Sequence, residues 1–308
     1  IDPTKIILMT FSKNTALELK TEVIKKLSNL EYDKIDKVEL FQKIESAQIC
    51  TMDSFCSDIL RKNCIDAGIN LNFKLFEDEN MENILNEICH QKMISFLKES
   101  KNFNSFCELM NLDILSQFSD STVPGRAKNL IRKAQGLGIS LNNCHNFIIP
   151  PHDIKLGDIK SNLESWDINK KNSLTQKEIK THLANAISLS KGLDEFTKLV
   201  IEKPINKQSN FGKCMFKLVQ DAIYKINYPY IIAFAKYVSS CFQEFNFYKQ
   251  INSLLTYDDI KLHAVEILEK KSNEFHFEFI IVDEVQDSSI IQHRLINSLW
   301  RNDSKLIT

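Results

Sequence analysis

Segments that read as a strand, a turn and a helix stand at both ends of this 308-residue chain and are missing from its middle. Each joins a short apolar run to a stretch whose apolar residues recur at helical spacing. The pairs are 6–9 with 14–27, 49–51 with 53–62, and 279–282 with 289–300, and a further apolar run begins at 306–307. Because such units build parallel sheets, we predict one parallel sheet assembled from both ends of the chain.

The middle of the chain is predicted to be mostly α-helical. Helical periodicity covers residues 77–99, 126–135, 176–190, 212–224 and 230–250. Pro150 and Pro151 exclude a continuous helix where they stand. The predicted fold class is therefore α/β, with a sheet domain from residues 1–69 and 256–308 and a helical domain, residues 70–255, inserted in it. Ligands of such a sheet bind at the carboxyl ends of its strands.

Composition narrows the class of protein. The formal net charge of −1 gives no argument for nucleic acid, so any DNA-binding surface must be a local patch. The 8 cysteines include no Cys-x-x-Cys pair, which argues against a zinc or iron–sulfur site and suits reduced thiols in the cytoplasm. The apolar runs are too short to span a membrane, and no signal peptide is visible. Since the chain starts at Ile1 and ends inside an apolar run, we expect both ends to be cut.

The continuous apolar run 279–282, which is expected of a strand buried on both faces of a parallel sheet, ends in two adjacent carboxylates, Asp283 and Glu284. Adjacent carboxylates repel unless a cation or solvent offsets the repulsion. Nucleotide hydrolases use such a pair, one group helping to hold Mg²⁺ and a neighbour orienting the attacking water. The alternative is a strand-to-helix turn whose acids favour the helix N-terminus, with Ser288 or Ser289 as the cap.

The string that begins at Asp283 resembles the Walker B motif of superfamily 1 UvrD-like helicases, which is written D-E-F-Q-D-T with a later Gln. The departures are Val285 in place of Phe and Ser288 in place of Thr. The resemblance implies that Asp283 coordinates the Mg²⁺ of ATP and that Glu284 is the catalytic base for water. It also implies that Gln286 couples the nucleotide state to the DNA-facing side, and that Gln292 belongs to the nucleotide site.

The segment after the first strand resembles motif Ia of the same family, T-F-T-N-K-A-A-x-E-M. The resemblance implies that Thr10, Phe11 and Ser12 contact single-stranded DNA. Hydroxyls at a helix N-terminus suit a strand phosphate. The usual Asn-Lys order is reversed here, as Lys13 and Asn14. The alternative is a plain helix cap made by Ser12 or Asn14.

Residues 49–56 are similar to the family segment T-x-H-S-F, which implies a second contact with single-stranded DNA through Thr51 and Ser54. Asp53 stands where His is common, and we expect it to cap the helix instead. Residues 255–260 resemble the segment L-x-F-x-D-L, for which we expect a structural role.

The separation of these motifs implies a large inserted domain, as in RecB- and AddA-type helicases rather than compact UvrD or Rep. The resemblance implies a RecA-like, P-loop-NTPase-like motor, ATP and Mg²⁺ as cofactors, and single-stranded or duplex DNA as the partner. The resemblance does not decide whether a second nuclease–helicase subunit is also a partner. The activity expected of the parent protein is ATP hydrolysis coupled to movement on single-stranded DNA, in recombination and repair.

The phosphate-binding motif G-x-x-x-x-G-K-[ST] does not occur in these 308 residues. The nearest approach, at 207–214, has Lys207 for the first Gly and Cys214 for the Ser/Thr. We therefore expect this chain alone to be inactive as an ATPase. The alternative function is a non-catalytic DNA-binding or scaffolding remnant of the helicase fold.

Two weaker patterns have competing interpretations. Residues 167–178 imitate a calcium-binding EF-hand loop, but a helix capping box explains the same letters. A basic cluster could follow a DNA backbone or form a solvated helix face. Its members are Arg126, Lys128, Arg132 and Lys133.

Overall fold

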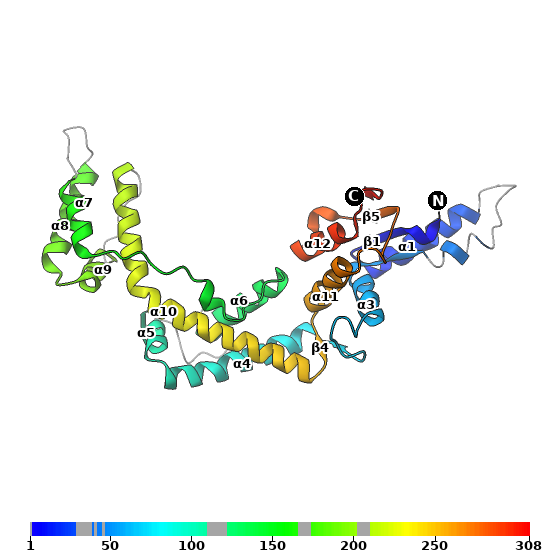
Figure 1. Ribbon diagram of the computed structural model, residues 1–308, viewed down its shortest axis with the longest axis horizontal. Helices are drawn as coiled ribbons and strands as arrows, with labels where there is room; N and C mark the ends of the chain where they lie inside the picture. The colour runs from blue at the N-terminus through cyan, green and yellow to red at the C-terminus, as the bar shows by residue number, and fades with distance from the viewer. Residues whose placement is uncertain are drawn as a thin grey trace. The chain divides into compact units, whose positions relative to one another are not determined.

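The computed structural model describes residues 2–28, 39, 42–44, 47–109, 122–165, 174–201 and 210–308. The chain divides into two compact units (Figure 1). The sheet unit comprises Ile1–Gln91, Ser116–Asn142 and Ser240–Thr308, and the helical unit comprises Lys92–Leu115 and Asn143–Ser239. The divisions fall within two helices, α4 (Asp78–Glu99) and α10 (Asn210–Ile251). The predicted domain boundaries at residues 69/70 and 255/256 stay a prediction.

A four-stranded parallel sheet joins the two ends of the chain. Its order is β2-β1-β5-β6. The strands are β1 (Ile6–Thr10), β2 (Gln48–Thr51), β5 (Phe279–Val282) and β6 (Lys305–Ile307), and a short 3-10 helix, η1 (Pro3–Lys5), precedes β1. Figure 1 shows blue β1 beside orange β5, with Met9 opposite Val282. The predicted fold class, a parallel sheet built from both chain ends, is confirmed.

One face of the sheet carries the core of the sheet unit. Alternate residues of β1 and β5, such as Met9 and Ile280, are fully buried against three helices. These helices are α3 (Met52–Lys62), α11 (Tyr257–Lys270) and α12 (Ile290–Leu299). Parallel strands read as continuous apolar runs because helices cover both faces.

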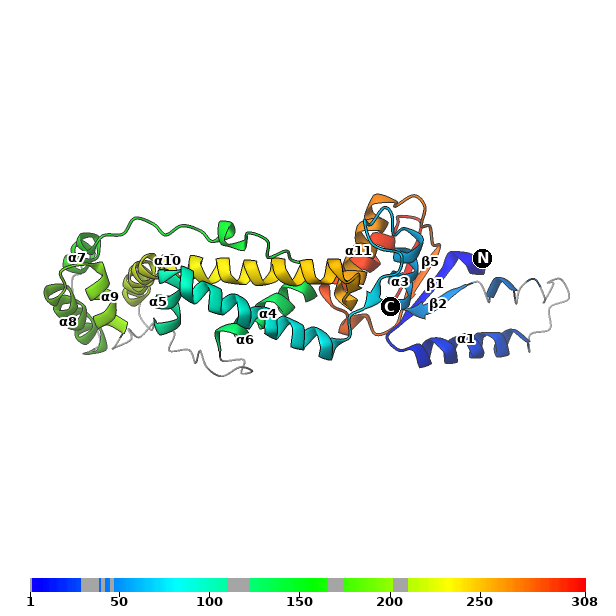
Figure 2. The same cartoon turned by 90° about the horizontal axis from the view of Figure 1, so that it is seen from below.

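The expectation that 279–282 is buried on both faces is wrong for the second face. Phe279 and Ile281 keep partial exposure. Helix α1 (Lys13–Ser28) packs on β2 and β1 rather than on β5, as Figure 2 shows. On the face that α1 covers, β1 and β2 are therefore packed against a helix and β5 is only partly covered.

The sheet unit also contains a second, two-stranded parallel pair. Strand β3 (Lys74–Leu75) lies beside β4 (Leu254–Leu255). The backbone N–H of Lys74 donates to Ser253 O at 2.8 Å, and that of Phe76 donates to Leu255 O at 2.8 Å. Helix α6 (Val123–Gly136) belongs to the same unit and confirms the helix predicted at 126–135.

The helical unit has a core of its own. Its apolar cluster includes Ile159, Leu183 and Phe196, all fully buried. Its elements are α5 (Lys101–Leu109), α7 (Leu156–Glu164), α8 (Leu174–Leu189), α9 (Leu193–Ile201), the 3-10 helix η2 (Cys144–Phe147) and much of α10. No helix among the described residues is long and apolar enough to cross a membrane.

The helices predicted at 212–224 and 230–250 form one continuous helix, α10. Pro229 lies inside it and removes one backbone donor. Apolar residues on both sides of the proline, such as Ala222 and Ala233, are buried. Tertiary packing therefore outweighs the local penalty of the proline.

A buried ion pair fixes the junction between α10 and α11. Lys249 Nζ lies 2.9 and 2.7 Å from the two carboxylate oxygens of Asp259, and its side chain is 7% exposed. Asp259 also accepts the backbone N–H of Thr256 at 2.9 Å, which completes a capping box at the start of α11. This arrangement gives the segment 255–260 the structural role expected of it.

We expect Lys249→Met to lower the free energy of unfolding by about 3 kcal/mol, because the change leaves a largely buried carboxylate without its cation. Urea unfolding followed by circular dichroism measures the loss. Lys26→Met is the matched control, since Lys26 pairs with Glu22 at 3.0 Å on an exposed helix face and exposed pairs contribute little. Equal unfolding midpoints for the two variants would contradict the structural role of Lys249.

Candidate functional site

Three predicted site residues meet at the carboxyl ends of adjacent strands. Thr10 ends β1 opposite Thr51 of β2. Asp283 follows β5 on the other side of β1, and its backbone N–H donates to Met9 O at 3.0 Å. Thr10 is fully buried and Thr51 is 7% exposed, whereas Asp283 is exposed. The sheet therefore brings the two threonines and the carboxylate to one edge.

The acidic turn after β5 has an unusual backbone. Glu284 has φ of +54°, a left-handed conformation that side chains with a Cβ rarely adopt. The 3-10 helix η3 (Val285–Asp287) follows directly. The Gln286 Nε2 donates a hydrogen bond to Glu284 Oε2. The turn thus holds both predicted catalytic side chains, Glu284 and Gln286, in mutual contact on the surface.

The carboxylates of this turn suit a cation. Asp283 and Glu284 are exposed, and neither forms an ion pair with a lysine, arginine or histidine of the described residues. The described part of the chain contains no group of three or more His, Cys, Asp or Glu side chains that could enclose a metal. A site with one or two carboxylates fits Mg²⁺, which usually takes its remaining oxygens from phosphates and water.

Helix α12 begins with a capping box. The Ser289 Oγ accepts the backbone N–H of Gln292 at 3.3 Å, and Gln292 Oε1 accepts that of Ser289 at 2.7 Å. Of the two serines considered, Ser289 is the cap. The carbonyl oxygen of Gln292 is therefore engaged with the backbone, so a contact with nucleotide would fall to its amide nitrogen.

Helix α1 begins beside the same edge. Ser12 is its cap, because its Oγ accepts the backbone N–H of Thr15 at 3.0 Å. The buried Thr10 hydroxyl donates to Ser12 O at 2.9 Å and fixes the turn before the helix. Phe11, between them, is 44% exposed. The segment thus presents an aromatic ring and a serine next to a helix N-terminus.

At the start of α3 the expectation for Asp53 is wrong. The cap is Thr51, whose Oγ1 accepts the backbone N–H of Ser54 at 3.1 Å and donates to Ser54 Oγ at 2.9 Å. A cap residue must have extended backbone just before the first turn, and Thr51 has it, with φ −78° and ψ 154°. Asp53 lies inside the first turn of α3, and its side chain does not cap the helix.

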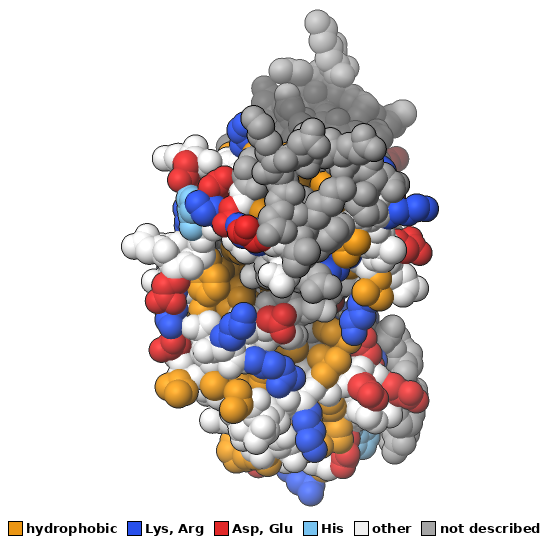
Figure 3. All heavy atoms as spheres, turned by 90° about the vertical axis from the view of Figure 1, so that its right-hand side faces the viewer, with side chains coloured by type: hydrophobic (Ala, Val, Ile, Leu, Met, Phe, Trp, Pro, Cys, Tyr) orange, Lys and Arg blue, Asp and Glu red, His pale blue; other side chains and the backbone are white. Residues whose placement is uncertain are grey.

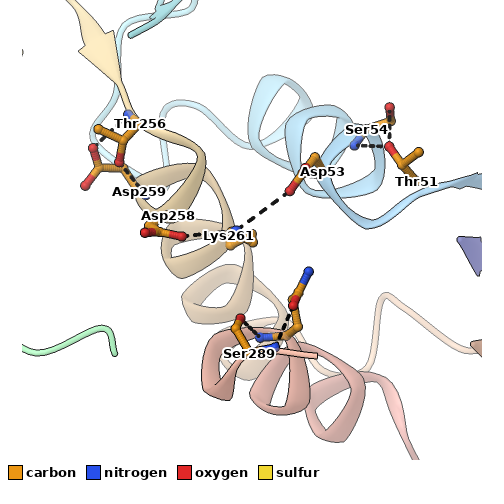
Figure 4. A network of polar contacts seen from close by, with 9 residues as sticks. Thr51, Asp53, Ser54, Thr256, Asp258, Asp259, Lys261 and Ser289 are labelled. Carbon is orange, nitrogen blue, oxygen red and sulfur yellow. Dashed lines mark hydrogen bonds and ion pairs between the residues drawn. The ribbon is translucent and has the colours of Figure 1, made fainter. Parts of the chain in front are cut away.

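Figure 4 shows the direction in which the Asp53 side chain points. Its carboxylate points away from Thr51 and Ser54 and toward Lys261 of α11, whose Nζ lies 3.9 Å from Asp53 Oδ1. The same ammonium lies 3.0 Å from Asp258 Oδ1. No pattern in the sequence singled out Lys261, since only its spacing from Asp258 within one helix could have suggested a contact.

A partly buried cysteine lies close to this edge. Cys50 precedes Thr51 in β2, and burial, with a smaller effect of the Asp58 carboxylate, raises its pKa to about 11. Its thiol is therefore protonated at neutral pH.

The model of the UvrD/REP helicase N-terminal domain family matches residues 1–308. The chain belongs to this family. An ATP-dependent helicase/nuclease subunit of Streptococcus pyogenes serotype M3 is 24% identical over 377 aligned positions, covering 98% of this chain and 30% of the relative. A protein of the same name from Clostridium kluyveri is 22% identical, and the alignment again covers 98% of this chain and 30% of the relative. One from Lactobacillus johnsonii is 27% identical over 169 positions, covering 50% of this chain and 13% of the relative. The chain spans about 30% of the length of the first two.

The predicted relationship to UvrD-like helicases is thus confirmed. This UvrD/REP domain also contains a cavity away from the strand edge. A cavity of about 510 Å³ in the sheet unit lies along α11, lined by residues such as Phe73, Phe242 and Leu262. None of the predicted site residues lines it. The candidate site is the open strand edge and not this cavity.

The basic cluster of the UvrD/REP domain is partly neutralised. Lys128 Nζ lies 3.0 Å from Glu82 of α4, and Arg132 also pairs with Glu82. On the face drawn in Figure 3, basic side chains lie among acidic, hydrophobic and uncharged ones where the structure describes the surface. These ion pairs favour the solvated helix face over a DNA track.

The calcium-loop pattern cannot be placed as a unit. Its residues up to 173 lie outside the described residues, and Thr175 and Glu178 belong to helix α8.

We expect Glu284→Gly to raise the free energy of unfolding by about 1 kcal/mol, because glycine adopts the left-handed conformation without a Cβ clash. Urea unfolding of wild type and variant measures the change. Asp287→Gly is the matched control, since Asp287 lacks a positive φ and glycine there only adds unfolded-state entropy. A Glu284→Gly variant less stable than wild type would show that the turn is not strained.

Proposed function

We propose that this chain is part of the motor of an ATP-dependent DNA helicase, which couples ATP hydrolysis to movement on single-stranded DNA in recombination and repair. The observation that carries the proposal is the shared strand edge. It brings the acidic turn at Asp283 and the capped starts of α1 and α3 together. Family membership supports the same interpretation.

The acidic turn supplies the nucleotide chemistry in this proposal. Asp283 holds the Mg²⁺ that accompanies ATP, and Glu284 accepts the proton of the attacking water. Bound Mg²⁺ neutralises charge that develops on the phosphates. Gln292 contributes its amide nitrogen to the nucleotide site. The left-handed backbone at Glu284 supports its role, because strained conformations concentrate at functional sites.

The starts of α1 and α3 supply the DNA contacts. Ser12 and Ser54 offer hydroxyls beside helix N-termini, where backbone dipoles favour a phosphate. Thr51 contributes to the second contact by donating its own hydroxyl proton to Ser54 Oγ, which orients that side chain. Thr10 orders the first of these turns from within the core. Phe11 offers an exposed ring on which a base can stack.

Gln286 connects the two halves of the site. It already hydrogen-bonds Glu284, so a change at the nucleotide can alter the position of its amide. We assign it the coupling of nucleotide state to the DNA-facing side.

The relatives narrow the proposal to the RecB/AddA type. Their shared name combines helicase with nuclease and describes one member of an assembly. We therefore propose duplex or single-stranded DNA as the substrate, a partner that is a second nuclease–helicase subunit, and a cytoplasmic location. The large helical region between β2 and β5 supports this subgroup over compact UvrD or Rep.

In the natural protein that contains this chain, Glu284→Gln should lower DNA-stimulated ATP hydrolysis by about 100-fold or more while leaving nucleotide binding intact. Glutamine keeps the size of glutamate but cannot accept the proton. Asp283→Asn should weaken both binding and turnover, because it removes a Mg²⁺ ligand. Steady-state ATPase assays with single-stranded DNA, alongside nucleotide titrations, measure both effects. Near-normal turnover in a folded Glu284→Gln protein would favour the non-catalytic remnant.

These 308 residues alone should neither bind ATP tightly nor hydrolyse it, because they lack the phosphate-binding motif whose backbone N–H groups and lysine cradle the triphosphate. Fluorescent-nucleotide titration and phosphate release by the purified chain test this. Turnover above background that Glu284→Gln abolishes would overturn the expectation.

A further inference from the structure

The start of α3 carries a charge that conflicts with its proposed role. Asp53 directly precedes Ser54, and both lie in the first turn of the helix. A carboxylate there would repel a DNA phosphate approaching the Thr51 and Ser54 hydroxyls. The Asp53 side chain is 47% exposed, so its charge is not removed by burial.

Lys261, on the neighbouring helix α11, forms an ion pair with Asp53. Its side chain is 12% exposed, and its Nζ lies 3.9 Å from Asp53 Oδ1 and 3.0 Å from Asp258 Oδ1. Among the described residues no other cation pairs with Asp53. The same Asp53 oxygen is buried and has no hydrogen-bond partner there, so the ammonium is its main electrostatic compensation.

The bridge is not needed to hold α3 against α11. That contact buries apolar residues of both helices, among them Phe55, Ile59 and Ala264. Ion pairs with half-exposed carboxylates add little to stability. The position of Lys261 is therefore better explained by where it directs Asp53 than by packing.

We infer that Lys261 is a positioning residue for the DNA-binding end of α3. Its ammonium, shared with Asp258, offsets part of the Asp53 charge and draws that carboxylate toward α11, away from Thr51 and Ser54, as Figure 4 shows. The Ser54 hydroxyl, which Thr51 orients through its own hydrogen bond, then meets a strand phosphate with less competing negative charge. The inference rests on the proposed function, since it concerns the DNA contact assigned there.

The test uses the natural protein that contains this chain and a fluorescein-labelled single-stranded oligothymidylate. Equilibrium binding is measured by anisotropy from low to high salt. Lys261→Met should weaken binding by about fivefold at low salt, because it frees the Asp53 charge. The difference should shrink at high salt, where the repulsion is screened.

Three further variants separate positioning from other effects. Lys261→Arg keeps the cation and should bind within about twofold of wild type. Lys261→Met combined with Asp53→Asn should also return to within about twofold, because the repelling charge is gone. Lys270→Met removes a lysine from the exposed far end of α11 and should leave binding unchanged, which excludes a general effect of net charge.

The outcomes are distinct. Wild-type-like binding by Lys261→Met, or a double variant as weak as Lys261→Met alone, overturns the inference while leaving the proposed function standing. Failure of the folded wild-type protein to bind the oligonucleotide overturns the proposed function itself. Thermal unfolding of each variant shows whether it is folded, and a loss of binding that Asp53→Asn reverses cannot come from misfolding.

Discussion

The parallel pairing of β1 with β5 is the contact on which the other features of the sheet unit depend. It joins backbone near residue 6 to backbone near residue 279, with Ile6 opposite Phe279 and Met9 opposite Val282. Parallel strands cannot be joined by a tight turn and need a crossover. Here the crossover contains β2, α3, the whole helical region and α11. The apolar faces of β1 and β5 hold the pair in register, because a shift by one residue would turn Met9 and Val282 out of the core.

That register also determines which side chains can act together. Thr10 and Asp283 become neighbours only because Asp283 donates its backbone N–H to Met9. Thr51 joins them through the pairing of β2 with β1. Ligands of parallel sheets bind at the carboxyl ends of the strands, and here the exposed Asp283 lies at that edge while the buried threonines order the turns beside it. The left-handed residue Glu284 then turns the chain sharply out of β5, so that its carboxylate and Gln286 stay on the surface.

Local sequence patterns predicted most elements well. The strands 6–9 and 279–282 and the helices 77–99 and 126–135 agree with β1, β5, α4 and α6, because apolar periodicity reports burial directly. The helical segments 212–224 and 230–250 join into the single helix α10, because the packing of its apolar residues offsets the local cost of Pro229. The cap of α3 was misassigned to Asp53 because Thr51 and Asp53 are both good caps, and only the exact start of the helix distinguishes them.

Apolar runs and helical spacing along the chain were enough to predict the two-ended parallel sheet, and the resemblance of three segments to UvrD-like motifs was enough to predict the family. They were also enough to predict that the acidic turn follows an apolar strand. The charge partners came from the folded chain alone: Lys261 faces Asp53, Lys249 is buried against Asp259, and Lys128 and Arg132 are paired with Glu82. All of these contacts link different helices. Electrostatic partners depend on distance in space, and nothing in the local pattern of a helix fixes which charge a neighbouring helix will present.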